Sequence, residues 1–141
     1  MQGDLSALIE RVENATGPDR ELDCLIDCFR HNRKFLGWTA DTGIVGYRYE
    51  HPTIGADLGC WRIGYTSSLD AALALVEEIL PGWTRLVDAT APELGICVEL
   101  FPSDDIAERT ESARGDHNRE THATLLALLR ALSNGSKEGV A

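Results

Sequence analysis

Three cysteine and histidine residues near the N-terminus have side chains that can bind a metal ion. Cys24, Cys28 and His31 are spaced i, i+4, i+7, which places them on one face of a helix. The i+7 position lies about 10 Å along the helix axis, too far for three ligands to share one zinc ion with bonds of about 2.0–2.3 Å. A further ligand would have to come from Cys60 or Cys97. Cysteine is among the most buried residue types, so core packing is the interpretation we favour, with no metal and no cofactor.

Two further histidines, His117 and His122, flank the start of a C-terminal helical segment in "DHNRETH". The spacing is not that of an H-E-x-x-H zinc site, and a gap of five residues predicts rings that point apart. An acid–base role for His117 with Asp116 or Glu120 is the alternative to exposed polar residues at a helix start. The sequence contains no phosphate-binding loop, nucleophile elbow or kinase signature. We therefore predict no catalytic residues and a protein that is not an enzyme.

Four acidic residues are close together in a polar segment: Asp104, Asp105, Glu108 and Glu111. Carboxylate oxygens can bind a divalent cation, but the segment lacks the alternating ligands and central glycine of an EF-hand. A solvated acidic loop is the simpler interpretation, and such a loop is also a candidate binding surface.

A glycine-rich segment over residues 37–64 contains most of the aromatic side chains that we consider as binding anchors, namely Trp38, Tyr47, Tyr49 and Trp61. Tyrosine and tryptophan are enriched at binding hot spots. The same side chains also suit the cover of a small sheet. Both roles, recognition surface and sheet core, stay open at this point.

Two helices are predicted before this segment. Apolar residues of "DLSALIERVENA" recur at helical spacing, and "TGPDRELDCLIDCFRH" begins a second helix with a stripe of Leu22, Leu25, Ile26 and Phe29. Within residues 37–64, alternation around Val45 to Tyr49 predicts a strand, Cys60 to Ile63 a second short strand, and "HPTIGADLG" a loop.

A third helix is predicted in "YTSSLDAALALVEEILPGW". Ser67 is the expected N-cap with Asp70 as its capping-box partner, and Pro81-Gly82 is the expected stop. The expected buried stripe contains Leu69, Leu73, Val76 and Leu80. An aspartate at Leu73 is therefore expected to unfold the protein.

Strands are predicted in "WTRLVD" and "ICVELF", followed by a mobile polar loop over 102–117. A last helix is predicted in "RETHATLLALLRALS", ended by Asn134-Gly135, with a disordered tail over 136–141. Hairpin-like strands and separate helices predict an α+β fold: an antiparallel sheet of about three or four strands in an α/β/α-type sandwich. We expect one domain over 1–135, with the aromatic segment 37–64 as an insertion.

The chain has 141 residues, 23 acidic side chains against 13 basic ones, and a formal net charge of −10. Such a field repels phosphate backbones, so we expect no direct binding of nucleic acid. It permits attraction to a basic surface on another protein, although acidic charge also serves solubility alone. No apolar run is long enough for a membrane span, and no signal segment is evident, so we expect a cytoplasmic protein.

The pattern of "RELDCLID", then "YTSSLDAALALVEEILPGW", a strand pair and "THATLLALLRAL" resembles the phage ABA sandwich domain family. The resemblance covers residues 20–27 and 65–132. It implies a sheet layered with helices and an origin in a phage or prophage. It brings no catalytic residues, since its motifs are those of helix capping and core packing.

These observations lead to rival hypotheses of function. The first is a phage-encoded accessory protein that binds a host protein with a basic surface, in a sharper form as an acidic inhibitor of a bacterial defence complex such as a CRISPR-type one. The second is a sponge for a nucleotide or other small molecule, held by the aromatic segment and the helix N-terminus at Thr66 and Ser67. A concave aromatic pocket that contains Arg48 or Arg62 would favour it. A small enzyme is a third possibility that no motif supports.

Overall fold

A computed structural model of the chain describes residues 2–39, 46–51, 55–60, 64–91, 93, 95–105 and 110–138. The helices are α1 (Gln2–Asn14), α2 (Arg20–Arg30), α3 (Leu69–Ile79) and α4 (Glu120–Glu138). The strands are β1 (Lys34–Thr39), β2 (Gly46–His51), β3 (Gly55–Cys60), β4 (Trp83–Asp88), β5 (Ile96–Pro102) and β6 (Ala113–His117). A short 3-10 helix, η2 (Ser103–Asp105), follows β5. The predicted α+β class is confirmed.

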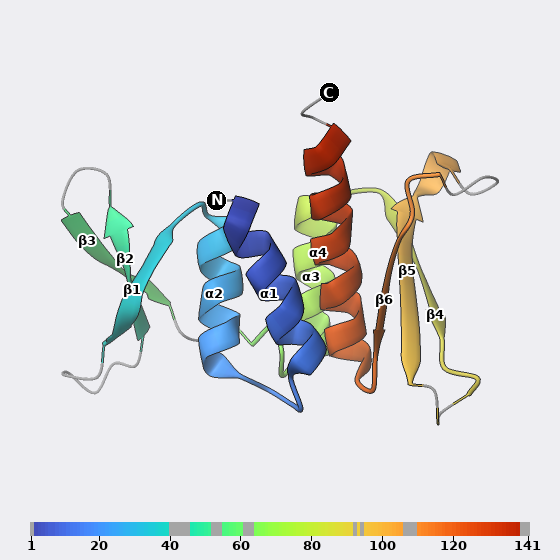
Figure 1. Cartoon of the computed structure of the whole chain (residues 1–141), viewed down its shortest axis with the longest axis horizontal. Helices are drawn as coiled ribbons and strands as arrows, with labels where there is room; N and C mark the ends of the chain where they lie inside the picture. Colours follow the sequence, from blue (N-terminus) through green and yellow to red (C-terminus); the bar gives the residue numbers. More distant parts are fainter. Residues whose placement is uncertain are drawn as a thin grey trace.

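The strands form two antiparallel sheets, an N-terminal sheet of order β1-β2-β3 and a C-terminal sheet of order β4-β5-β6. The four described helices lie between these two sheets (Figure 1). The layers therefore differ from the expected α/β/α sandwich, because each sheet has helices on one side only. The cause is the early segment that was expected to be an insertion, which forms a sheet of its own on the far side of α2.

The central element is α4, which packs against β5 and β6 on one side and against α1 and α3 on the other. The predicted leucine stripe of this helix is only part of its buried surface, since alanines on other faces are buried as well. Its fully or almost fully buried apolar residues are Ala123, Leu125, Leu126, Ala127, Leu128, Leu129 and Ala131. A helix that is apolar around most of its circumference belongs in the interior.

The contact between α4 and β6 depends on Gly115. A Cβ atom at this position would lie 2.2 Å from the carbonyl oxygen of Ala123 and 2.7 Å from the backbone nitrogen of Ala127. Both of these neighbours are helix backbone, which cannot move aside as a flexible side chain can. The absence of a side chain at residue 115 therefore allows the helix to lie directly on the strand.

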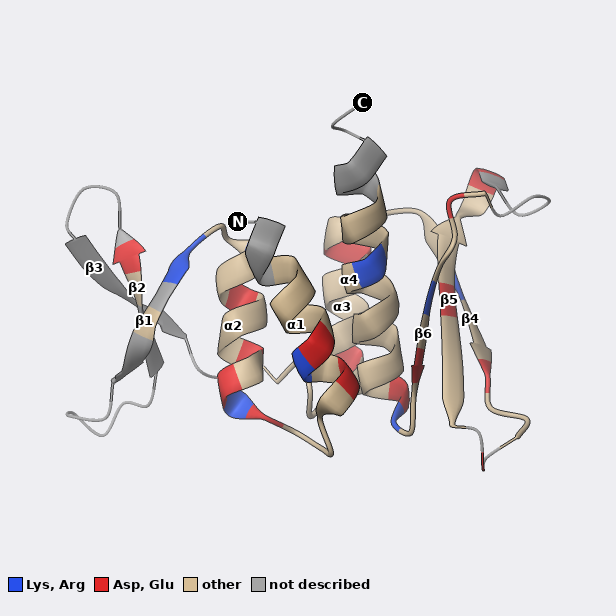
Figure 2. Ribbon diagram, in the orientation of Figure 1, with Lys and Arg blue, Asp and Glu red and all other residues tan. Residues whose placement is uncertain are grey.

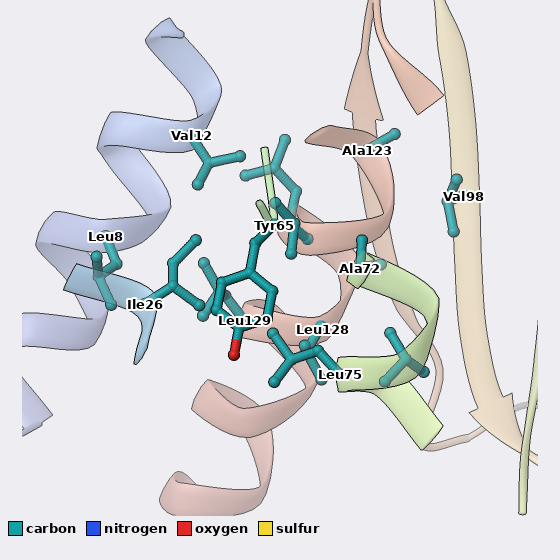
Figure 3. Close-up of a cluster of buried hydrophobic side chains, with 14 of the residues drawn as sticks. Leu8, Val12, Ile26, Tyr65, Ala72, Leu75, Val98, Ala123, Leu128 and Leu129 are labelled. Carbon is teal, nitrogen blue, oxygen red and sulfur yellow. The ribbon is translucent and has the colours of Figure 1, made fainter. Parts of the chain in front are cut away.

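The main hydrophobic core lies where the helices meet (Figure 3). Leu8 and Val12 come from α1, Ile26 from α2, and Leu75 from α3. Tyr65, in the turn before α3, extends its ring into the middle of this cluster and is only 3% exposed. The turn before α3 is thus part of the core and not a surface loop.

The register of α3 differs from the predicted one. Its N-cap is Ser68, whose side chain accepts a hydrogen bond from the backbone N–H of Ala71, so the prediction of Ser67 is wrong. The buried face contains Ala72, Leu75 and Val76, with Ile79 partly buried against the core, while Leu69 and Leu73 are only half-buried. The choice of face went wrong because alanines and leucines occur almost all round this helix, which gives several possible apolar stripes.

Three predicted loops or ends are also corrected. Gly55 to Gly59, expected in a loop, belong to β3, and residues 61–63 of the predicted second strand lie outside the described residues. The polar segment 102–117 contains β6, which the sequence did not indicate because "ARGDH" has no β-branched or aromatic residue. Asn134-Gly135 does not end α4, which continues to Glu138. Glycine ends a helix by taking a positive φ, and among the described glycines only Gly82 and Gly95 do so.

The revised face of α3 gives a prediction for paired variants. Leu75→Asp places a charge in the core next to α4 and should cost about 4 kcal/mol or more of unfolding free energy. Leu73→Asp should cost only about 1 kcal/mol, because that side chain is half-exposed. Chemical denaturation followed by circular dichroism measures both. Equal losses in the two variants would show that the buried face is assigned wrongly.

The close contact at Gly115 gives a second prediction. Gly115→Ala should lower the unfolding free energy by about 2 kcal/mol or more, because α4 has to move away from β6 to admit the methyl group. Gly17→Ala is the matched control, since the nearest atom to a Cβ there is in the flexible side chain of Arg119, at 3.5 Å. The control should be neutral or slightly stabilising. A neutral Gly115→Ala variant would contradict the contact.

Candidate functional site

Buried carboxylates on α2 and hydroxyl groups before α3 form a polar network inside the protein. Asp23, 5% exposed, accepts two hydrogen bonds at its Oδ1 atom from Thr66, one from the backbone N–H and one from Oγ1, both at 2.7 Å. The Thr66 hydroxyl oxygen also accepts a hydrogen bond of 2.8 Å from the backbone N–H of Asp19, the N-cap of α2. One threonine therefore joins the first turns of α2 to the turn before α3.

Tyr65 extends the same network by one helical turn. Its hydroxyl accepts a hydrogen bond of 2.9 Å from Nη1 of Arg30 and donates one of 3.4 Å to Oδ1 of Asp27. Arg30 also forms an ion pair with Glu78 on α3. The segments "RELDCLID" and "YTSS" thus meet in this network.

Burial governs the chemistry of these groups. Burial raises the pKa of Tyr65 and also that of Asp23, where the hydrogen bonds from Thr66 act in the opposite direction. Tyr65 and Thr66 are 3% and 1% exposed, so no substrate can reach them in this conformation. The network holds α2 and α3 together, and we assign it no catalytic role.

The cysteines of α2 lie in a small second core. Cys24 and Cys28 pack with Tyr49 of β2, and the guanidinium of Arg33 lies over the Tyr49 ring at 4.1 Å. Burial raises the pKa of the Cys24 thiol to about 12. His31 faces Asp27, with its Nε2 atom 3.4 Å from Oδ1. In the described part of the chain, no three His, Cys, Asp or Glu side chains are grouped so that they could hold a metal ion.

The predicted aromatic binding residues have different outcomes. Tyr49 is 7% exposed and packs against Cys24 and Cys28 of α2, which is the core role that the sequence left open for it. Trp38 and Tyr47 are opposite each other in the β1-β2 pair, but their side chains lie outside the described part. Trp61 lies wholly outside it, as do the side chains of Arg48 and Arg62.

The predicted acidic residues lie beyond the end of β5. Asp104 is exposed in η2, where Ser103 donates a hydrogen bond of 2.6 Å to the carbonyl of Gly82 just before β4. Glu111 is exposed shortly before β6. The side chain of Asp105 and all of Glu108 lie outside the described residues.

The two C-terminal histidines meet, contrary to the prediction that their rings point apart. Their ring centroids are 4.6 Å apart with an interplanar angle of 19°. His117 ends β6 and His122 lies in the first turns of α4, so the tight reversal between strand and helix brings the rings together. Sequence spacing along a single helix could not predict this contact.

Both rings of this histidine pair are hydrogen-bonded to backbone carbonyls of the segment that connects α1 to α2. Nε2 of His117 lies 2.9 Å from the carbonyl oxygen of Ala15, and Nε2 of His122 lies 3.1 Å from that of Gly17. A carbonyl only accepts, so Nε2 carries the proton in both rings. The Nδ1 atom of His117 accepts a hydrogen bond of 3.0 Å from the backbone N–H of Arg119, which makes that ring neutral.

Neither histidine is placed for acid–base catalysis. His122 is 0% exposed, and both nitrogens of His117 are hydrogen-bonded to the backbone. The proposed acidic partners are engaged elsewhere, Asp116 with Arg114 and Glu120 with Arg85. The pair is therefore a structural contact whose strength depends on both rings being neutral.

The surface charge has a consistent arrangement. Most of the described basic side chains lie in ion pairs with acids of the same chain; they are Arg11, Arg30, Arg33, Lys34, Arg85, Arg114 and Arg130. Figure 2 shows blue and red side by side on several elements. Exposed carboxylates without an ion pair remain in the described part, namely Glu10, Asp70, Glu77, Asp88, Glu93 and Asp104. The uncompensated charge on this surface is thus negative.

The buried histidine pair makes stability dependent on pH. Burial, and secondarily His117, lowers the pKa of His122 below its ordinary value of 6.5. The unfolded chain then takes up a proton at a higher pH than the folded protein does, so stability is complete above 6.5 and is lost as the pH falls through that value. His122→Gln keeps an N–H donor for the Gly17 carbonyl but does not titrate.

We therefore expect wild type to lose more unfolding free energy than His122→Gln between about pH 8 and about pH 5. Urea denaturation at several pH values measures the difference. Glu77→Gln at an exposed position of α3 is the control for the effect of a substitution as such. Parallel profiles for wild type and His122→Gln would contradict the assignment of a neutral buried ring.

Comparisons with models of protein families, with curated proteins and with solved structures found no match. In the described part of the chain, no helix combines the length and the apolar character needed to cross a membrane.

Proposed function

We propose that this chain is a phage-encoded accessory protein that acts by binding a lysine- and arginine-rich surface of a bacterial host protein. A nucleic-acid-binding complex of a defence system is the partner class that presents such a surface. The observation that carries the proposal is the arrangement of charge. The described basic side chains are largely neutralised within the chain, while carboxylates on α1, α3 and the C-terminal sheet are left exposed.

The electrostatic consequence is a surface that attracts cations and repels nucleic acid. A net charge of −10 on 141 residues is large for solubility alone. Charge complementarity chiefly accelerates association and excludes wrong partners, which suits a competitor of nucleic acid for a basic face. The phage origin is supported by the resemblance of the two motifs that meet in the buried network, and by nothing in the surface charge.

The direct test starts with the immobilised protein, bacterial lysate and mass spectrometry of what it retains. For the partner so identified, the association rate should fall about tenfold as ionic strength rises from about 0.05 to about 0.5 M. Asp88→Asn with Asp104→Asn removes two exposed, unpaired charges and should slow association and flatten this salt dependence. Arg114→Gln with Asp116→Asn is the matched control, because it changes as many residues in the C-terminal sheet without altering net charge.

The nucleotide-sponge hypothesis predicts a different result. Binding would then survive both double variants and high salt, and would be lost with Trp38→Ala or Trp61→Ala. A salt-insensitive interaction of that kind would overturn the proposal.

A further inference from the structure

β4 is an edge strand of the C-terminal sheet in the described part of the chain. β4 pairs with β5 and with no other described strand. In Figure 1 this strand is the part of the sheet farthest from the helices. α4 packs on β5 and β6, and the second half of β4, Leu86 to Asp88, is exposed.

The exposed half of β4 carries two large apolar side chains. Leu86 and Val87 are 41% and 39% exposed. Successive residues of a strand point to opposite faces, so apolar surface is exposed on both sides of this edge. The first half of the strand is held in place, because Trp83 packs against the core and Arg85 bonds to Glu120 and Thr124 of α4. The first half of β4 is therefore fixed to the core and to α4, and its second half is accessible to a partner.

The usual protections of an edge strand are missing from β4. Natural edges carry lysine, proline or a bulge, or are covered by another segment. "WTRLVD" contains neither lysine nor proline. Its pairing with β5 runs without a bulge from Trp83↔Pro102 to Asp88↔Cys97. Its single cation, Arg85, is held in an ion pair of 2.9 Å with Glu120.

The charges around this edge select its occupant. Asp104 lies beyond the Trp83 end, and Asp88 and Glu93 lie at the other end. A second copy of this chain would bring the same acids and a further net charge of −10 to the contact. An extended segment with basic residues around apolar ones complements both the charge and the exposed leucine and valine.

We propose that β4 is the docking edge for an extended, lysine- or arginine-containing segment of a partner protein, which adds to the C-terminal sheet as a further strand. Backbone hydrogen bonds along β4 supply affinity. Two successive side chains of the added strand, which point to opposite faces, contact Leu86 on one face and Val87 on the other. The inference deepens the proposed function, on which it rests for the basic character of the partner. It specifies the surface and the conformation in which the partner is held.

The probe is a blocked seven-residue peptide with two adjacent valines at its centre and lysines around them, compared with a peptide of the same composition in which one lysine separates the two valines. The adjacent-valine peptide should bind at least about tenfold more tightly in a calorimetric titration, because only adjacent valines point to the two opposite faces on which Leu86 and Val87 lie. Amide hydrogen exchange of wild-type protein should slow in β4 when it is bound. Equal affinity of the two peptides, or protection that spares β4, would overturn the docking edge.

A pair of neutral variants separates edge pairing from simple attraction. Leu86→Asn with Val87→Asn removes the apolar contacts and lowers β-propensity without changing charge, and should weaken binding of the adjacent-valine peptide about tenfold or more. Leu36→Asn is the matched control, since Leu36 is 43% exposed on β1 of the other sheet. That control should bind as wild type does. Thermal unfolding confirms that each variant is folded, and the exchange measurement on wild type does not depend on any variant.

The outcomes distinguish the two proposals. Salt-sensitive binding that is weakened by Asp88→Asn with Asp104→Asn but unaffected by the asparagine pair at 86 and 87 overturns the docking edge and leaves the proposed function in place. Absence of binding to every basic probe overturns both. Sedimentation of the protein alone as a dimer that becomes a monomer in the asparagine variant overturns the assigned occupant in favour of a second copy.

Discussion

The hydrogen bonds between the Asp23 carboxylate and Thr66 are the contact on which the relative placement of the helices depends. A buried carboxylate is costly unless it is hydrogen-bonded, and Asp23 receives two short bonds from a single residue. Thr66 in turn is bonded to the first turn of α2 and precedes the Ser68 cap of α3 by two residues. Because Thr66 is fixed in this way, the direction of α3 after the turn is fixed as well. The direction of α3 in turn determines which of its faces packs against α4. Loss of either partner would leave a polar group buried without its hydrogen bonds.

Much of the polar chemistry of this chain is thus used inside the fold. The carboxylates of α2, the Tyr65 hydroxyl and the stacked histidines all satisfy or hold backbone segments, and the deepest of them are inaccessible. At the surface, most of the described cations are paired with acids of the same chain, and the groups left over are carboxylates and the edge strand β4. This arrangement is the basis of the proposal that the protein recognises another macromolecule by charge and backbone pairing.

Local patterns predicted the elements whose periodicity is strong. The leucines of α4 and the alternation in β4 and β5 were correctly assigned, because each depends on neighbours in the sequence. The buried face of α3 was misassigned because the small residue Ala72 is fully buried, whereas the larger Leu73 beside it is only half-buried. β6 was missed because its strand character comes from pairing with β5 and from α4 above it. The histidine pair and the Asp23–Thr66 contact join residues far apart in the chain, so the motifs were visible but their meeting was not.

Gly115 has a consequence for how the C-terminal sheet chooses its alignment. Side chains of β6 alternate between the helix side and solvent, with Ala113, Gly115 and His117 toward α4. If β6 slipped by one residue along β5, Arg114 or Asp116 would come under the backbone of α4, where even a methyl group does not fit. A slip by two residues would place the methyl of Ala113 or the ring of His117 there. Steric clashes with α4 therefore exclude the neighbouring registers of β6 on β5. The register that remains places His117 where its Nε2 atom reaches the carbonyl oxygen of Ala15.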